Sequence, residues 1–299
     1  MCHVRNYIAF CIYFNYTPFP PTSTSLSNFA TFLARSYKAP QSIINNLSSL
    51  KSICSILDFS TTQFDSIQLR LTNRGIKRVK QHLPKQAAPI TPTILLKLYS
   101  VMDTSDPVQA TYWSAFLFSF FAMARKSNIM YTSSSTAVNR PLRRKDCVFT
   151  PGGVLLNFNW SKTNQFSARI HKVPLVAIPG SVLCPVTAYK TMRKLIPASS
   201  LAPAFVLPTS KGLSPMYYHS YQTFLRNKLS ELGLPAQLYS SHSFRRGGAT
   251  FAFKCAVPGE LIKQHGDWSS AAYLSYLNFS MDQKVNVSKR LANRILNFH

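Results

Sequence analysis

A run of fourteen mostly apolar residues, Thr111–Ala124, ends at the basic pair Arg125-Lys126. Fourteen residues are too few to cross the hydrocarbon core of a bilayer, which takes about 20. The run therefore predicts a helix at the centre of a protein core and no membrane span. With 299 residues, 46% of them hydrophobic, the chain is long enough to build a sizeable core around such a helix.

The chain on the N-terminal side of this run is typical of a small helical domain. Ile43, Leu47 and Leu50 repeat at the spacing that places apolar side chains on one helical face. Pro84-Lys-Gln-Ala-Ala-Pro89 is typical of a linker, and Thr91-Pro92 then suits a helix start, with Thr at the N-cap. We expect a helical domain over residues 1–85, a linker over 86–90 and a second domain over 91–299.

The second domain combines helices with one β insert. Cys147–Phe149, Val154–Trp160 and Ile170–Leu175 alternate apolar and polar residues, and Gly152-Gly153 suits the first turn between them. Helical patterns resume at Pro185, and one of them, Ala271–Asn278, has Leu274 and Leu277 as its apolar face. A last amphipathic stretch is Val285–Leu296. The expected fold class is mainly α with a small antiparallel β-sheet.

The charge balance indicates a polyanionic partner. Lys and Arg number 34 against nine Asp and Glu, and the basic residues run through both predicted domains. Double-stranded DNA is the partner that we expect, although a basic stretch can also be a solvated helix face. The candidate DNA-binding residues are Arg70, Arg74, Lys77, Arg78, Lys80, Lys85 and Arg246.

The scarcity of acids excludes several classes of chemistry. Two-metal nucleases need carboxylates that converge on divalent cations, and the nine acids are scattered. No Gly-rich phosphate loop indicates a nucleotide, and no pair among the six cysteines is spaced as in a zinc site. We expect no metal and no cofactor, and free thiols in an intracellular compartment.

The polar residues that could carry chemistry suit phosphate transfer by a tyrosine. His242 and Arg245 lie three residues apart and share a helical face, and Tyr276 follows as a nucleophile. Arginine forks bind phosphoryl oxygens as charge builds on them. The candidate catalytic residues are Arg125, Lys162, His242, Arg245, Trp268 and Tyr276. Singly each has an ordinary alternative: Arg125 can extend to solvent, Lys162 can be a surface lysine at a hairpin tip, and Trp268 can cap the core.

In this order, the residues carry a resemblance. The segments Phe-Phe-Ala-Met-Ala-Arg125-Lys-Ser-Asn, Trp-Ser-Lys162-Thr-Asn-Gln-Phe and His242-Ser-Phe-Arg-Arg-Gly-Gly-Ala-Thr resemble the tyrosine recombinase (phage-integrase-like) family. The amino-acid sequences of these three segments are similar to those of the eukaryotic branch of the family, which is found in mobile elements and their derivatives. The likeness is specific over residues 89–280, whereas residues 1–85 resemble the family's core-binding domain more loosely.

The resemblance implies a role for each residue. Arg125 and Arg245 would bind the scissile phosphate, Tyr276 would attack it to form a 3′-phosphotyrosyl bond, and Lys162 would protonate the leaving 5′-oxygen. His242 would handle the tyrosine proton or orient the phosphate. Trp268 would hydrogen-bond the phosphate and pack beside Tyr276.

The chain also departs from the family pattern. Many relatives carry an acid three residues after the first arginine, where this chain has Asn128. Gly266-Asp267-Trp268 is one residue longer than the common Gly-His, so His265 competes with Trp268 for that role. Tyr273 competes with Tyr276 as the nucleophile.

The resemblance implies site-specific DNA cleavage and rejoining for recombination or integration, by a tetramer on paired DNA sites in the nucleus. In the family, the segment after the nucleophile often docks into a neighbouring subunit, which we expect of Val285–Leu296. Two alternatives remain open: relaxation of DNA in the manner of a type IB topoisomerase, and a domesticated protein that binds DNA without cutting it.

Overall fold

The computed structural model describes the chain except residues 1, 83–85, 133–140, 161–168, 277–280 and 297–299. The chain divides into two compact units, Met1–Lys85 and Gln86–His299, each with its own hydrophobic core. Lys85 and Lys162 are therefore candidates that lie outside the described residues.

The first unit is helical. Its elements are α1 (Cys2–Tyr13), α2 (Ser23–Ser36), α3 (Pro40–Ile56), the 3-10 helix η1 (Thr62–Asp65) and α4 (Ile67–Lys80). The rings of Tyr7 and Phe29 lie at the centre of the core, 5.1 Å apart and edge to face. Ile43, Leu47 and Leu50 of α3 are buried beside them, as their helical spacing predicts.

The second unit is built around α6 (Pro107–Phe121), of whose fifteen residues eleven are buried. Asp106 caps its first turn and Pro107 occupies the first helical position, so the helix begins where the apolar run approaches. The prediction of a central core helix is confirmed. Among the described residues, no helix is both long and apolar enough to cross a membrane.

The other helices of this unit surround α6 or follow it in the chain. They are α5 (Pro92–Ser100), α7 (Lys126–Ile129), η2 (Arg144–Asp146), α8 (Pro185–Leu195), α9 (Tyr218–Glu231), η3 (Ala236–Leu238), α10 (Ser241–Lys254), α11 (Gly259–His265), η4 (Ala271–Tyr276) and α12 (Met281–Leu296). Phe118 of α6 packs against Tyr189 of α8, and Phe116 stacks on Phe244 of α10. These contacts join α6, α8 and α10 in one core.

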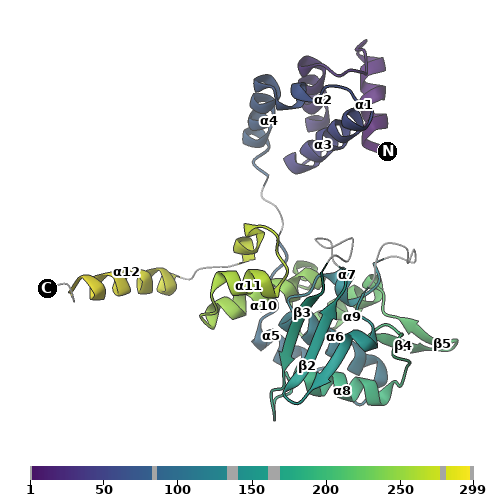
Figure 1. Cartoon of the computed structure of the whole chain (residues 1–299), viewed down its shortest axis with the longest axis vertical. Coiled ribbons are helices and arrows are strands. Elements are labelled where there is room, and N and C mark those ends of the chain that lie inside the picture. The colour runs from purple at the N-terminus through teal and green to yellow at the C-terminus, as the bar shows by residue number, and fades with distance from the viewer. Residues whose placement is uncertain (1, 83–85, 133–140, 161–168, 277–280, 297–299) are drawn as a thin grey trace. The chain divides into compact units, whose positions relative to one another are not determined.

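The expected sheet is present in the order β1-β2-β3, all antiparallel (Figure 1). Its strands are β1 (Cys147–Thr150), β2 (Gly153–Phe158) and β3 (His171–Val176). Val154 pairs with Leu175 and Leu156 with Val173, and these four side chains face the core. A second hairpin, β4 (Val206–Thr209) and β5 (Gly212–Pro215), was not predicted. The fold class, mainly α with small antiparallel sheets, is confirmed.

Helix α10 packs closely against the end of α6. A Cβ at Gly248 would overlap the carbonyl of Phe120, so glycine lets α10 approach the end of α6. The segment 86–90, expected as a linker, also packs in this unit: the Ile90 amide donates to Ser243 at 3.0 Å, and the Ile90 side chain is buried. These two contacts hold the backbone of α10, which carries His242 and Arg245, and the first of them also holds the end of α6, which precedes Arg125.

One local prediction is wrong. The stretch Ala271–Asn278 was expected to be a helix with Leu274 and Leu277 on its apolar face, but it forms the 3-10 helix Ala271–Tyr276, in which Leu274 is 49% exposed. Leu277 lies outside the described residues. Among the described side chains of this helix, that of Tyr273 is buried, and its ring packs 6.1 Å from that of Trp268 in a small separate core.

Candidate active site

Arg125 lies at the start of α7, immediately after the central helix ends. Its Nη1 donates to Oδ2 of Asp267 at 2.9 Å, and its Nη2 donates to the Asp267 carbonyl at 2.6 Å. The Arg125 side chain keeps 19% of its surface exposed, whereas that of Asp267 keeps 5%. The guanidinium is thus held by two hydrogen bonds to Asp267 and remains partly exposed to solvent.

Arg245 is held in a different way. It is almost completely buried on α10, and its Nη1 donates to the carbonyl of Met123, two residues before Arg125. The flat guanidinium lies over the indole ring of Trp268, with its carbon 3.7 Å from the ring centre. Arg125 and Arg245 line one small cavity together with His171 and Asp267.

A tight turn places Trp268 over Arg245. Asp267 adopts the left-handed backbone conformation, with φ of 56°, which Asp and Asn tolerate better than most residues. The Trp268 ring folds back against Gly266, where a Cβ would overlap the ring. The turn therefore brings the Asp267 carboxylate to Arg125 and the Trp268 indole to Arg245.

His242 is an exposed residue in the first turn of α10. Its pKa lies below the ordinary value because the surrounding protein partly desolvates the ring and because Arg245, Arg125 and Lys126 place positive charge near it. The neutral imidazole is therefore the favoured form at neutral pH. A neutral ring beside two arginines can accept a proton from a hydroxyl nucleophile.

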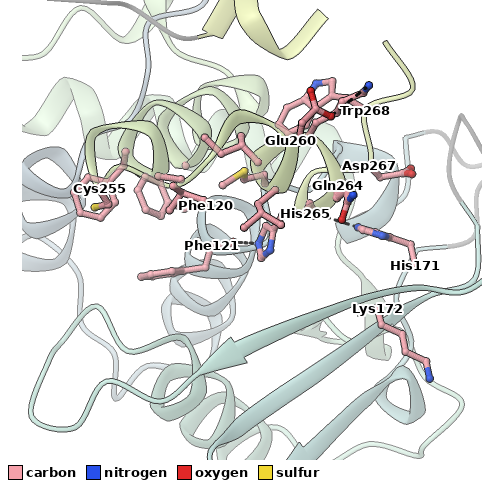
Figure 2. Close-up of a pocket in the computed structure, with 18 of the residues that line it drawn as sticks. Phe120, Phe121, His171, Lys172, Cys255, Glu260, Gln264, His265, Asp267 and Trp268 are labelled. Atoms are coloured by element: carbon pink, nitrogen blue, oxygen red, sulfur yellow. Dashed lines mark hydrogen bonds and ion pairs between the residues drawn. The ribbon is translucent and has the colours of Figure 1, made fainter. Parts of the chain in front are cut away.

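A larger cavity of about 1050 Å³ lies between β3 and the helices α10 and α11, and His171, Asp267 and Trp268 line part of it. Figure 2 shows His171 directed at the backbone of His265, while Lys172 points away. Nε2 of His171 donates to the His265 carbonyl at 3.0 Å, and Nε2 of His265 donates to the Phe121 carbonyl at 2.8 Å. Burial lowers the pKa of His171.

The two candidates for the His-or-Trp role are therefore differently placed. The His265 ring is bound to the backbone at the end of α6, whereas the Trp268 ring contacts Arg245. The two tyrosines also differ. Tyr273 is buried at 6% exposure against Trp268, while Tyr276 ends η4, and its side chain lies outside the described residues.

The candidate DNA-binding residues fall into two groups. Arg70, Arg74, Lys77 and Arg78 are exposed on α4, and the first three share one helical face, with Lys80 half-buried at its end. Arg246 differs, because it is 8% exposed and its Nη1 donates to the carbonyl of Ala87 at 3.1 Å. In this structure Arg246 holds the chain that enters the second unit.

Sequence reasoning did not single out Asp267 or Arg169. Arg169, just before β3, forms a short ion pair with Oδ1 of Asp267. The spacing of 142 residues between Arg125 and Asp267 and of 98 between Arg169 and Asp267 leaves no local pattern to detect. The available signal was the extra acid in the Gly-Asp-Trp segment. In the described part of the chain, no three His, Cys, Asp or Glu side chains gather as metal ligands would.

No family model and no curated protein matches this chain. Solved structures do. The integrase of transposon Tn1549 in complex with transposon right end DNA is 15% identical, with a TM-score of 0.58 over 91% of this chain and 86% of that one. The XerH site-specific recombinase bound to palindromic difH substrate, a post-cleavage complex, is 13% identical, with a TM-score of 0.58 over 90% and 69%. The chain has the fold of these DNA recombinases.

Proposed function

We propose that this chain cuts and rejoins DNA at specific sites, with a tyrosine as the nucleophile. The observation that carries the proposal is the meeting of Arg125 and Arg245 in one cavity on a recombinase fold, with Trp268 stacked on Arg245. Two fixed guanidinium groups suit a phosphate whose negative charge increases in the transition state. The excess of 34 basic over nine acidic residues suits DNA as the source of that phosphate.

The reaction proceeds by exchange of one ester for another. The hydroxyl oxygen of Tyr276 attacks phosphorus and forms the 3′-phosphotyrosyl bond, while the bond from phosphorus to the 5′-oxygen breaks. Arg125 and Arg245 bind the non-bridging oxygens, His242 takes the tyrosine proton, and Lys162 supplies a proton to the 5′-oxygen. A DNA 5′-hydroxyl reverses the step without ATP because the covalent link keeps the ester energy.

Paired DNA sites require several copies of the chain. We propose that α12 of one copy docks into the 1050 Å³ cavity of another, in a tetramer on two duplexes. Helix α12 carries exposed apolar side chains, among them Leu291 and Ile295, and the cavity is lined by partly exposed Phe251 and Leu261. An apolar helix face and an apolar cavity wall are complementary.

The sequences of the three motifs around Arg125, Lys162 and His242 support assignment of the chain to the eukaryotic mobile-element branch of the family, with a DNA substrate in the nucleus. A fluorescent fusion of the full chain expressed in eukaryotic cells would accumulate in the nucleus. A fusion excluded from the nucleus would contradict this assignment.

A covalent-trapping assay tests the proposed function. A nicked DNA substrate releases a short strand after cleavage, so the protein–DNA adduct accumulates and is counted on a denaturing gel. We expect Tyr276→Phe to abolish the adduct while DNA affinity changes less than about threefold. Tyr273→Phe is the matched control, because it removes a hydroxyl from the buried tyrosine. We also expect the adduct to form in excess chelator.

Each outcome of the assay has a meaning. Adduct formation by Tyr276→Phe and not by Tyr273→Phe would transfer the nucleophile role to Tyr273. Tight DNA binding without any adduct would indicate a silent DNA-binding protein. An adduct that relaxes supercoiled DNA without pairing sites would indicate topoisomerase-like activity, and a need for magnesium would overturn the metal-free mechanism.

A further inference from the structure

Asp267 is a buried acid in a strongly basic surrounding. Its carboxylate is 5% exposed and forms ion pairs with both Arg125 and Arg169, one on each oxygen. Bringing a carboxylate out of water is costly unless charged partners and hydrogen bonds compensate. With both oxygens paired, Asp267 meets that condition and joins three segments that are distant in the sequence.

The contact with Arg125 has two parts of different kinds. Nη1 binds the side chain of Asp267 and Nη2 binds its backbone carbonyl, so the plane of the guanidinium is fixed by two points. A guanidinium has five N–H donors, and these two contacts use one from each terminal nitrogen. Arg125 can therefore be held by Asp267 and still bind a phosphate oxygen.

Asn128 does not take this role, although it follows Arg125 by three residues. Its Nδ2 donates to the carbonyl of Trp160 at 2.9 Å, at the end of the segment that precedes Lys162. A carboxylate at this position would face a carbonyl oxygen and repel it. Asn128 is thus committed to the backbone after β2, and the acid that contacts Arg125 comes from the turn before Trp268.

We propose that Asp267 is a positioning residue that sets the Arg125 guanidinium for the scissile phosphate and neutralises the repulsion between Arg125 and Arg169. This inference rests on the proposed function. The Asp267 turn also carries Trp268, which contacts Arg245. A single turn therefore fixes both arginines that would bind the phosphate.

The variant that tests the proposal is Asp267→Asn. Asn tolerates the left-handed backbone at this position, so the turn and its carbonyl contact are retained while the charge is lost. We expect single-turnover cleavage to slow roughly 10²-fold, the size of loss that a misplaced catalytic group causes. DNA affinity should change less than about threefold, because one phosphate contact among many is affected.

A double-mutant cycle separates positioning from simple stability. Arg125→Lys keeps a cation but loses the fork that Asp267 fixes. We expect Asp267→Asn to slow the Arg125→Lys protein by less than about threefold, since the link is already broken. Losses that multiply in the double variant, or wild-type cleavage by folded Asp267→Asn, would overturn the proposal.

Arg169→Gln controls for charge balance. Alone it should leave cleavage within about threefold of wild type, because the Arg125 contacts remain. Combined with Asp267→Asn it should restore any lost thermal stability, since one of the two repelling cations is gone, while cleavage stays slow. If the double variant recovered the wild-type cleavage rate together with its thermal stability, Asp267 would act only by stabilising the fold.

A spectroscopic measurement on the free protein distinguishes failure of this inference from failure of the proposed function. In ¹⁵N-arginine NMR spectra, the signal that Arg125→Lys removes should be resolved and slow to exchange, and Asp267→Asn should shift it and speed its exchange. An unchanged signal would overturn the link between the two residues. A wild-type protein that shows this link but forms no DNA adduct would overturn the proposed function and, with it, the catalytic purpose of the link.

Discussion

The guanidinium carbon of Arg245 lies 3.7 Å from the centre of the Trp268 ring. Both residues are buried, and the contact joins α10 to the turn after α11. Stacking on the indole face fixes the plane of the guanidinium without using its N–H donors. The contact therefore orients Arg245 and leaves donors for other acceptors.

Replacement of Trp268 should separate stacking from hydrogen bonding. Trp268→Ala should lower the free energy of unfolding by about 3–5 kcal/mol, because a large buried ring is lost, and should abolish cleavage. Trp268→Phe keeps an aromatic face for Arg245, so we expect a loss of about 1–2 kcal/mol and cleavage within about tenfold of wild type. Urea unfolding and the trapping assay measure the two effects. A stable Trp268→Phe protein that fails to cleave would instead indicate that the indole N–H binds the phosphate.

The parts of the fold that follow from local pattern were predictable. The α6 helix follows from the apolar run Thr111–Ala124, although it begins earlier, at Pro107, and the three-stranded sheet follows from alternation around Gly152-Gly153. The β4–β5 hairpin was missed because its strands have four residues each and only Val206 among them is buried, which leaves little hydrophobic pattern to detect.

The candidate site was predictable only where residues are close in the sequence or carry the family resemblance. Arg125, Arg245 and Trp268 were identified in this way, and the structure brings them together. The ion pairs of Asp267 join segments that are distant in the sequence, so no local sequence pattern indicates them. The 3-10 form of Ala271–Tyr276, in which Tyr273 packs against Trp268, was not indicated by the spacing of Leu274 and Leu277.

Cleavage should depend on pH through His242. Its pKa is lowered in the folded protein, so the ring is neutral above about 6.5 and takes up a proton only at a lower pH than in the unfolded chain. We expect the cleavage rate to be level above this value and to fall as the pH drops and the ring loses its capacity to accept a proton. As the pH drops, the unfolded chain takes up this proton at a higher pH than the folded protein does, so the free energy of unfolding should also fall.

Two variants identify the group that titrates. His242→Gln should remove the acidic fall in rate from an already reduced activity, whereas His219→Gln, at an exposed position on α9, should leave the profile unchanged. The pKa of His171 is also lowered, so its titration adds to the pH dependence of stability. The free energy of unfolding of each variant is therefore compared with that of the wild type at the same pH. An acidic limb that persists in His242→Gln would show that another group carries the proton.

The exposed basic face of α4 should contact DNA phosphates. Each phosphate contact adds about 0.9 to the slope of log affinity against log salt concentration. Arg74→Gln and Lys77→Gln should each make the slope shallower by about that amount in fluorescence anisotropy titrations. Lys51→Gln is the control, because Lys51 already pairs with Asp65 at 2.7 Å. Unchanged slopes for Arg74→Gln and Lys77→Gln would mean that this face is only solvated.

The C-terminal helix should serve assembly and leave binding to a single site intact. Leu291 and Ile295 are both more than 60% exposed, although they lie four residues apart on one face of α12. An apolar face of this kind is costly to leave in water and gains stability when another surface covers it. Deletion of residues 283–299 should keep affinity for one DNA site within about threefold and abolish the tetramer on paired sites, measured by analytical ultracentrifugation.

A pair of point variants assigns this effect to the apolar face. Leu291→Glu changes the net charge by one unit on that face, and Lys289→Gln changes it by one unit on the opposite side of the helix. We expect Leu291→Glu to weaken the tetramer at least tenfold, because a carboxylate would enter an apolar contact without a partner. Lys289→Gln should assemble like wild type. Equal weakening by both variants would mean that charge alone matters, and unimpaired assembly of the truncated chain would show that α12 does not dock in another copy.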